Sequence, residues 1–131
     1  MILNFLSGNN NTIIDFYKKI LYNIYIKKKE GVKMYFITTL RVLDKIIDDC
    51  RTVGYFSSYR DAYDRVINNT YDIFEDGFYN YAVITFIAEG LYANSVEQQW
   101  FKMTRNNEVI AIIEYHKRPD EIGEYKPYII G

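Results

Sequence analysis

Residues 34–43 are apolar except for two threonines and one arginine, which predicts a β-strand. Most of these side chains are β-branched or aromatic, as strands prefer. Residues 51–56 have a similar character, so the two segments are predicted to form a hairpin across a polar connection at 44–49. Alternation assigns the first strand's side chains to two faces: Phe36, Thr38, Leu40 and Val42 on one, and Tyr35, Ile37, Thr39 and Arg41 on the other.

Three more strands are predicted in the second half of the chain. The first of them is apolar on both faces, which indicates a central position in the sheet. From His116 onward the prolines and glycines predict an irregular tail. The predicted elements are a strand at 79–87, a turn at 88–90, a loop at 91–97, a strand at 98–104, a hairpin loop at 105–108 and a strand at 109–115.

One helix is predicted between the second and third strands. Ser57 and Ser58 precede Asp61 in the pattern of a helix N-cap, and apolar positions keep the helical period as far as Asp76. Gly77 then supplies a stop signal. The order strand-strand-helix-strand-strand-strand predicts an α+β domain, in which one long helix packs on one face of an antiparallel sheet.

A sheet with one helix on it leaves its other face to be covered. If Thr39 and Arg41 lie beside Tyr81 or Trp100, that face carries rings, threonines and an arginine. Such a face suits either a homodimer interface or a ligand platform. The N-terminal segment offers a third way to cover it.

Residues 1–33 are predicted to form a basic amphipathic N-terminal extension to a single domain at 34–131. The period of apolar side chains predicts a helix at 12–26, and six lysines against two acidic residues give the extension a net charge of +4. Three interpretations stay open: the helix packs on the domain or on a partner, it lies on an anionic membrane surface, or translation natively starts at Met34. The extension resembles neither a membrane span nor a signal peptide, so we expect the cytoplasm of a bacterial host.

Composition narrows the function classes. The 131 residues include one Cys and one His, which excludes an internal disulfide and a zinc site built from those ligands. Ten basic and fifteen acidic side chains give residues 34–131 a net charge of −5, so no long nucleic acid is expected as a partner. Aromatic residues make up 18% of the chain, an excess that a binding surface rich in aromatic side chains would explain.

The sequence argues against an enzyme. Cys50 and His116 are the only candidates for a thiol nucleophile and its base, and each reads more simply as a packing or solvated residue. The acidic pairs are adjacent in sequence and therefore diverge, and the glycines are isolated rather than grouped in a phosphate loop. We expect no catalytic residues, metal ligands or cofactor.

A small nucleotide is the one ligand for which the sequence offers a binding set. One or two arginines, a stacking ring and polar donors suffice for such a ligand, although core packing explains the rings equally well. The candidate residues are Thr38, Thr39, Arg41, Arg51, Asn80, Tyr81, Trp100 and Lys102.

Five blocks of sequence carry a resemblance: 35–41, 51–56, 79–84, 89–92 and 100–102. Together they resemble small uncharacterised proteins encoded by phages and prophages of low-GC Gram-positive and related bacteria. The resemblance implies a binding protein that counters host defence, either by blocking a host defence protein or by sequestering a small nucleotide signal, and we expect it to be a homo-oligomer. A regulatory protein-interaction domain without a ligand, or a membrane-surface protein that uses the N-terminal helix, are the alternatives.

Overall fold

The computed structural model describes residues 10–30, 33–90 and 94–125, and the chain divides into two units between residues 32 and 33. The first unit contains one helix, α2 (Asn10–Glu30), which is longer than the helix predicted at 12–26. Its apolar side chains from Ile14 to Ile24 are exposed. Within the described residues, no helix is both long and apolar enough to cross a membrane.

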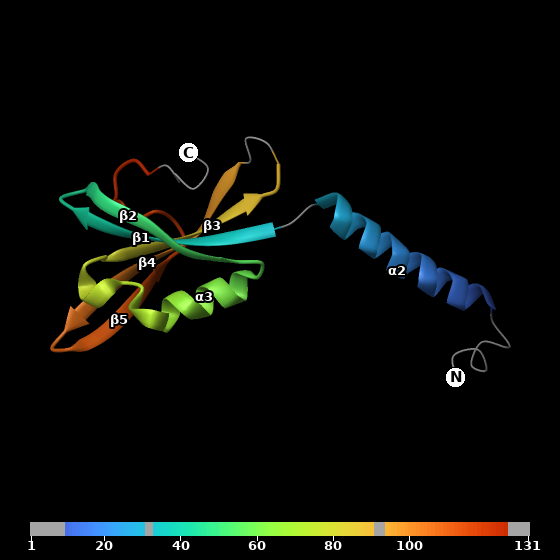
Figure 1. The fold of residues 1–131 in the computed structure, drawn as a ribbon, viewed down its shortest axis with the longest axis horizontal. Coiled ribbons are helices and arrows are strands. Elements are labelled where there is room, and N and C mark those ends of the chain that lie inside the picture. The colour runs from blue at the N-terminus through green and yellow to red at the C-terminus, as the bar shows by residue number, and fades with distance from the viewer. Residues whose placement is uncertain (1–9, 31–32, 91–93, 126–131) are drawn as a thin grey trace. The chain divides into compact units, whose positions relative to one another are not determined.

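The second unit is a five-stranded antiparallel sheet with the spatial order β2-β1-β3-β4-β5 (Figure 1). This confirms the predicted α+β class with an antiparallel sheet. The strands are β1 (Lys33–Leu43), β2 (Ile46–Phe56), β3 (Tyr81–Ala88), β4 (Ser95–Asn106) and β5 (Val109–Tyr115). The last of these has the predicted bounds, whereas residues 91–93 of the predicted loop lie outside the described residues.

Two hairpins have tighter turns than the sequence predicts. Asp44 and Lys45 both have positive φ values, 51° and 68°, which is the backbone of a two-residue type I′ turn. The second strand therefore begins at Ile46, and the prediction of a polar connection through residue 49 is wrong. Asn107 and Glu108 make the equivalent turn between β4 and β5, with φ values of 49° and 71°.

The helix after the first hairpin is much shorter than predicted. α3 (Tyr59–Ile67) begins as expected, with the Ser58 hydroxyl accepting a hydrogen bond from the Asp61 amide at 3.4 Å. It ends at Ile67 with Asn68 as its C-cap, and Asn69 takes a left-handed conformation with φ 45°. Two 3₁₀ turns follow, η1 (Thr70–Asp72) and η2 (Glu75–Gly77). The prediction of a continuous helix to Asp76 is wrong, because asparagine side chains compete for backbone groups and favour helix ends.

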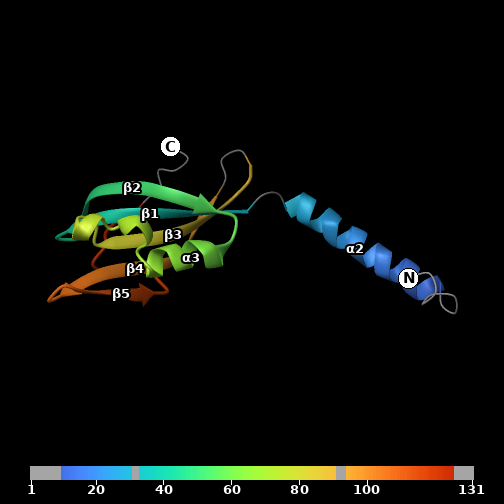
Figure 2. The same ribbon diagram turned by 60° about the horizontal axis from the view of Figure 1, so that its bottom comes forward.

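One face of the sheet packs against α3 and the chain that follows it (Figure 2). The central side chains of this face are Ile37, Ile84 and Phe101, and they meet Ala62 and Val66 of the helix. The alternation predicted for the first strand is confirmed by the partition of its side chains between two separate core clusters.

The opposite face is covered by the chain's own C-terminal segment, residues 116–125. Ile122 and Tyr125 of this segment pack on a cluster that includes Leu40, Tyr81 and Trp100. Tyr81 and Trp100 are only 2% and 1% exposed. The expectation that this part of the sheet stays open for a dimer or a ligand is therefore wrong. The segment from His116 onward, for which the sequence predicts an irregular tail, thus contributes side chains to the core.

Candidate functional site

The residues predicted to bind a nucleotide are divided between the two faces of the sheet. Thr39 pairs with Arg51 in the β1–β2 register, and Arg41 lies on the same face two positions further along β1. Tyr81 and Trp100 belong to the cluster on the opposite face. The expectation that Thr39 and Arg41 lie beside these rings is therefore wrong. The β1 side chains on the same face as Tyr81 and Trp100 are those of Leu40 and Val42.

Arg41 and Arg51 already have partners within the chain. The Arg41 Nε atom lies 3.5 Å from the Asp48 carboxylate, and its guanidinium lies over the Phe78 ring at 4.5 Å. The Arg51 Nη2 atom lies 2.7 Å from the Glu75 carboxylate. Each guanidinium thus ties neighbouring parts of the chain together.

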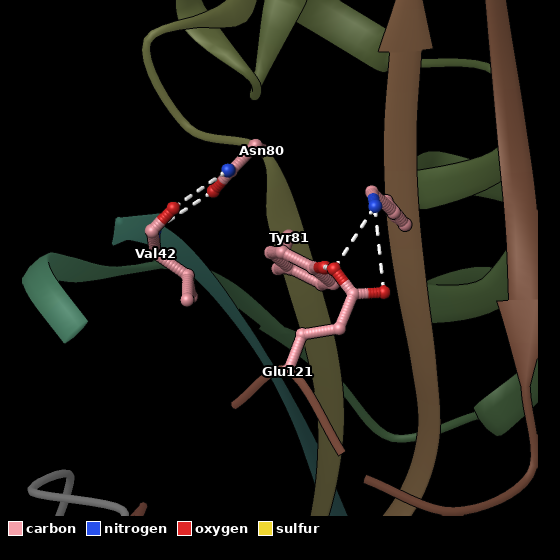
Figure 3. Close-up of polar contacts among 5 residues, drawn as sticks. Val42, Asn80, Tyr81 and Glu121 are labelled. Atoms are coloured by element: carbon pink, nitrogen blue, oxygen red, sulfur yellow. Dashed lines mark hydrogen bonds and ion pairs between the residues drawn. The ribbon is translucent and has the colours of Figure 1, made fainter. Parts of the chain in front are cut away.

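Tyr81, Lys102 and Glu121 form a polar group on the C-terminal side of the sheet (Figure 3). The Tyr81 hydroxyl donates to Glu121, and the Lys102 ammonium lies 3.0 Å from the same carboxylate oxygen. Burial, followed by the hydrogen bond to Glu121, raises the pKa of Tyr81 to about 12. Hydrogen bonds from Tyr81 and Lys102 lower the pKa of Glu121, and the hydrogen bonding of Lys102 to Glu121 raises the lysine pKa. The pKa values of all three groups are shifted away from neutral pH. The cluster therefore suits a structural contact better than acid–base catalysis.

Trp100 is held by a second polar group that involves Glu97 and Arg118. The indole Nε1 donates to one Glu97 oxygen at 3.0 Å, and Arg118 donates to the other. Arg118 also donates to the carbonyls of Gly123 and Tyr125, at 3.3 Å each. This arginine therefore folds the C-terminal segment onto the sheet.

The remaining candidate residues have structural partners as well. The Asn80 side-chain amide exchanges two hydrogen bonds with the backbone of Val42, at 2.8 and 2.9 Å (Figure 3). The Thr38 hydroxyl lies 3.2 Å from that of Thr52, and the Thr39 hydroxyl donates to the Arg51 carbonyl at 3.4 Å. β3 thus begins at Tyr81 rather than at residue 79, and the Asn80 side chain joins the residue before β3 to β1.

No activated nucleophile stands out among the described residues. Burial and the nearby Asp49 carboxylate raise the pKa of the Cys50 thiol, which disfavours the reactive thiolate. In the described part of the chain, no three His, Cys, Asp or Glu side chains converge as a metal site would require.

An apolar hollow of about 290 Å³ lies between β2, α3 and η1. Its walls include Ile37, Val53, Phe56 and Ile73, and Arg65 and Tyr71 stand at its rim. The Arg65 guanidinium lies over the Phe56 ring at 5.8 Å. The hollow thus combines an apolar interior with an arginine and a tyrosine at its rim, which are residue types enriched in binding hot spots.

Tyr71 is the most exposed large hydrophobic residue in the described chain, at 96%. Its backbone is left-handed, with φ 56°. That conformation is costly for a residue with a Cβ. The segment around it is held in place from both sides: Asn69 accepts a hydrogen bond from the Phe74 amide, and Arg51 and Arg105 make ion pairs with Glu75 and Asp76. The fold therefore presents this ring to solvent on a fixed segment.

A larger hollow of about 570 Å³ lies beside the start of β2, between residues 45–50 and the end of the C-terminal segment. Its lining includes the carboxylates of Asp48, Asp49 and Glu124. Lys45 supplies one positive charge against these three carboxylates, so the lining is net negative and disfavours phosphate and other anions. The smaller hollow is apolar and borders the exposed Tyr71 ring, so it is the better candidate binding site.

Sequence reasoning missed both the hollow and its rim. The helical period places Ile73 on the apolar face of one long helix, and it singles out neither Tyr71 nor Arg65. The signal that could have located the rim is the pair Asn68-Asn69, since consecutive asparagines mark a helix end.

No family model, curated protein or solved structure matches the chain.

Proposed function

We propose that this protein is a non-enzymatic binding protein whose working surface is the apolar hollow and its Tyr71 rim. The exposed, backbone-strained Tyr71 is the observation that carries the proposal. A large ring on a left-handed residue costs stability and buries little of its own surface, so folding alone does not account for it. A partner that covers the ring accounts for it.

The chemistry of the hollow suits a protein partner better than a nucleotide. An apolar interior of about 290 Å³ takes one or two aliphatic or aromatic side chains, and Arg65 at the rim suits a neighbouring carboxylate. A nucleotide needs a ring to stack on and free cations for its phosphates. Tyr81 and Trp100 are buried, and Arg41 and Arg51 are engaged in ion pairs.

The partner that we propose is a host defence protein. The resemblance of residues 34–102 to small phage and prophage proteins supports this class, since such proteins often act by blocking a component of the host. The net negative charge of residues 34–131 favours a partner whose surface is basic beyond the carboxylate that faces Arg65.

A capture experiment tests this function. The immobilised wild-type chain, Tyr71→Ala and Tyr55→Ala are incubated with bacterial extract, and retained proteins are quantified by mass spectrometry. Tyr55 is the matched control because it is 63% exposed and lies on the opposite face of the sheet. We expect a protein that wild type and Tyr55→Ala retain equally and that Tyr71→Ala loses by about tenfold or more. Equal retention by both variants would contradict the site.

A nucleotide arm separates the two binding modes. Thermal shifts are measured with mononucleotides and cyclic dinucleotides, using wild type and Arg51→Ala. We expect no shift with either protein. A shift in the wild type that disappears in Arg51→Ala would favour nucleotide sequestration instead.

Binding of α2 to a membrane surface is a second candidate function. Helical spacing puts Phe16, Ile20 and Ile24 on one side of this helix and Tyr22 on the other, and all four are exposed. Five lysines of the helix add attraction for anionic lipid. Flotation of the full chain with phosphatidylcholine vesicles, with and without phosphatidylserine, tests this function. Ile20→Glu should abolish flotation on the anionic vesicles, and Tyr22→Glu should preserve it.

A further inference from the structure

The two edges of the sheet differ in how they are protected against pairing. At one edge, β2 carries Asp48, Asp49 and Arg51 and has two irregularities in its pairing with β1. At the other edge, β5 has the sequence VIAIIEY, with one charge and a regular register against β4. Charges and bulges are the usual means by which proteins block edge pairing. β5 has almost no such protection, and no described strand pairs with its outer edge.

The hairpin turn determines which backbone groups of β5 point outward. In a two-residue type I′ hairpin, the residues that flank the turn form a hydrogen-bonded pair, here Asn106 and Val109. Alternation then directs the backbone groups of Ile110, Ile112 and Glu114 away from β4. Three N–H groups and three carbonyls thus line the open edge in the spacing that an antiparallel strand requires.

We propose that β5 pairs with β5 of a second copy of this chain, antiparallel, around a twofold axis at Ile112. In this register Ile112 faces its own counterpart, and Ile110 of each copy faces Glu114 of the other. All six outward backbone groups find partners, and two five-stranded sheets join into one. The interface is separate from the Tyr71 hollow and does not depend on it.

The side chains of β5 favour this register over its neighbours. Val109 and Ile113 are exposed on one face, and in this pairing they meet Tyr115 and Ala111 of the other copy, so the facing pairs are apolar. A shift of the axis to Ala111 or Ile113 leaves only two of the three outward-facing residues of each copy paired within β5, and a shift to Ile110 or Glu114 leaves only one. The axis at Glu114 would also place two carboxylates opposite each other. The register at Ile112 is thus the one that pairs β5 over its full length.

Contacts within one copy hold the Glu114 carboxylate in place beside the proposed interface. Its carboxylate accepts a hydrogen bond from the Tyr63 hydroxyl, and the buried Gln99 amide lies 3.5 Å from its other oxygen. Both contacts come from the same copy and hold the carboxylate on the α3 face of the sheet. The charge is therefore fixed close to Ile110 of the partner, where a substitution can report on it.

A matched pair of charge substitutions tests the proposal. Ile110→Glu and Ile110→Lys remove the same apolar side chain, which is 40% exposed, and differ only in the sign of the charge placed opposite Glu114. We expect a wild-type dimer by sedimentation equilibrium, a dissociation constant raised about tenfold or more in Ile110→Glu, and one changed by less than about threefold in Ile110→Lys. In Ile110→Glu with Glu114→Lys, pairing of opposite charges should restore the dimer.

Three results would overturn the proposal. They are a monomeric wild type at high concentration, equal weakening by the two charges, or a dimer that neither substitution affects. If the variants fold poorly, amide hydrogen exchange of the wild type decides. The amides of Ile110, Ile112 and Glu114 should become protected as the protein concentration rises, and unchanged exchange at these three positions would overturn the proposal as well.

Discussion

The ring of Tyr125 packs edge-on against the indole of Trp100, with ring centroids 5.3 Å apart and planes inclined at 82°. Tyr125 comes from the C-terminal segment and Trp100 from β4. Edge-to-face pairs of this kind add to the stability that burial supplies. The pair therefore anchors the C-terminal segment on the sheet and closes the surface where the sequence suggested a stacking platform.

Truncation of Tyr125 should destabilise the fold. Tyr125→Ala removes a ring that is 7% exposed, and we expect the free energy of unfolding to fall by about 3 kcal/mol in urea titrations. Tyr55→Ala, at a ring that is 63% exposed, should cost less than about 1 kcal/mol. Trp100 is the only tryptophan, so its fluorescence should also shift to the red in Tyr125→Ala. Equal losses from the two variants would contradict the anchoring role of Tyr125.

Arg118 should be as important to the C-terminal segment as the aromatic pair. Arg118→Ala leaves Glu97 without its cation and two carbonyls without a donor, so we expect a loss of about 2–4 kcal/mol and faster amide exchange at residues 120–125. Arg60→Ala removes an exposed ion pair with Asp64 on α3 and should cost less than about 0.5 kcal/mol. Unchanged exchange at residues 120–125 in Arg118→Ala would exclude this role.

The Tyr81 phenol should make the fold sensitive to alkali. Its pKa is raised from 10 in the unfolded chain to about 12 in the fold, so the folded protein binds more protons between these values. The stabilisation is complete below pH 10 and is lost as the pH rises towards 12. Urea midpoints should fall over this interval, and fall less steeply in Tyr81→Phe. Raised pKa values at Tyr79 and Tyr125 leave the variant part of the decline, but identical slopes would contradict the assignment.

Tyr71 and Asn69 should respond in opposite directions to glycine. Both have left-handed backbones, which glycine adopts without strain. Tyr71 is 96% exposed, so Tyr71→Gly should leave the free energy of unfolding unchanged or raise it by up to about 1 kcal/mol. Asn69 accepts a hydrogen bond from the Phe74 amide and donates one to Asp72, so Asn69→Gly should lower it by about 1 kcal/mol. A clear loss from Tyr71→Gly would mean that the ring serves the fold.

Sequence patterns predicted the sheet better than they predicted the surfaces. Alternation in β1 separated Ile37 from Leu40 correctly, because strand geometry is local. The relative phase of β1 and β3 depends on their register, in which Leu40 lies opposite Tyr81. No local signal in either strand specifies that pairing, so the proposed nucleotide set drew on both faces of the sheet.

The C-terminal segment and the end of α3 show two other limits. Ile122 and Tyr125 reach the core without any periodic pattern, since Arg118 rather than regular secondary structure holds them in place. Apolar residues after Ile67 continue the helical period by spacing alone, although Asn69 has already turned the chain. In both places, specific hydrogen bonds from single side chains outweigh the hydrophobic pattern.

Site-specific photo-crosslinking tests the proposed binding surface most directly. The photoreactive residue p-benzoyl-phenylalanine is placed at position 71 or, as the control, at position 55, in the full chain expressed in bacterial cells. Because Tyr71 stands at the rim of the hollow, we predict a covalent adduct with a discrete protein from position 71, and none from position 55. Adducts of the same kind from both positions, or none from position 71, would contradict the assignment of the Tyr71 hollow as the working surface.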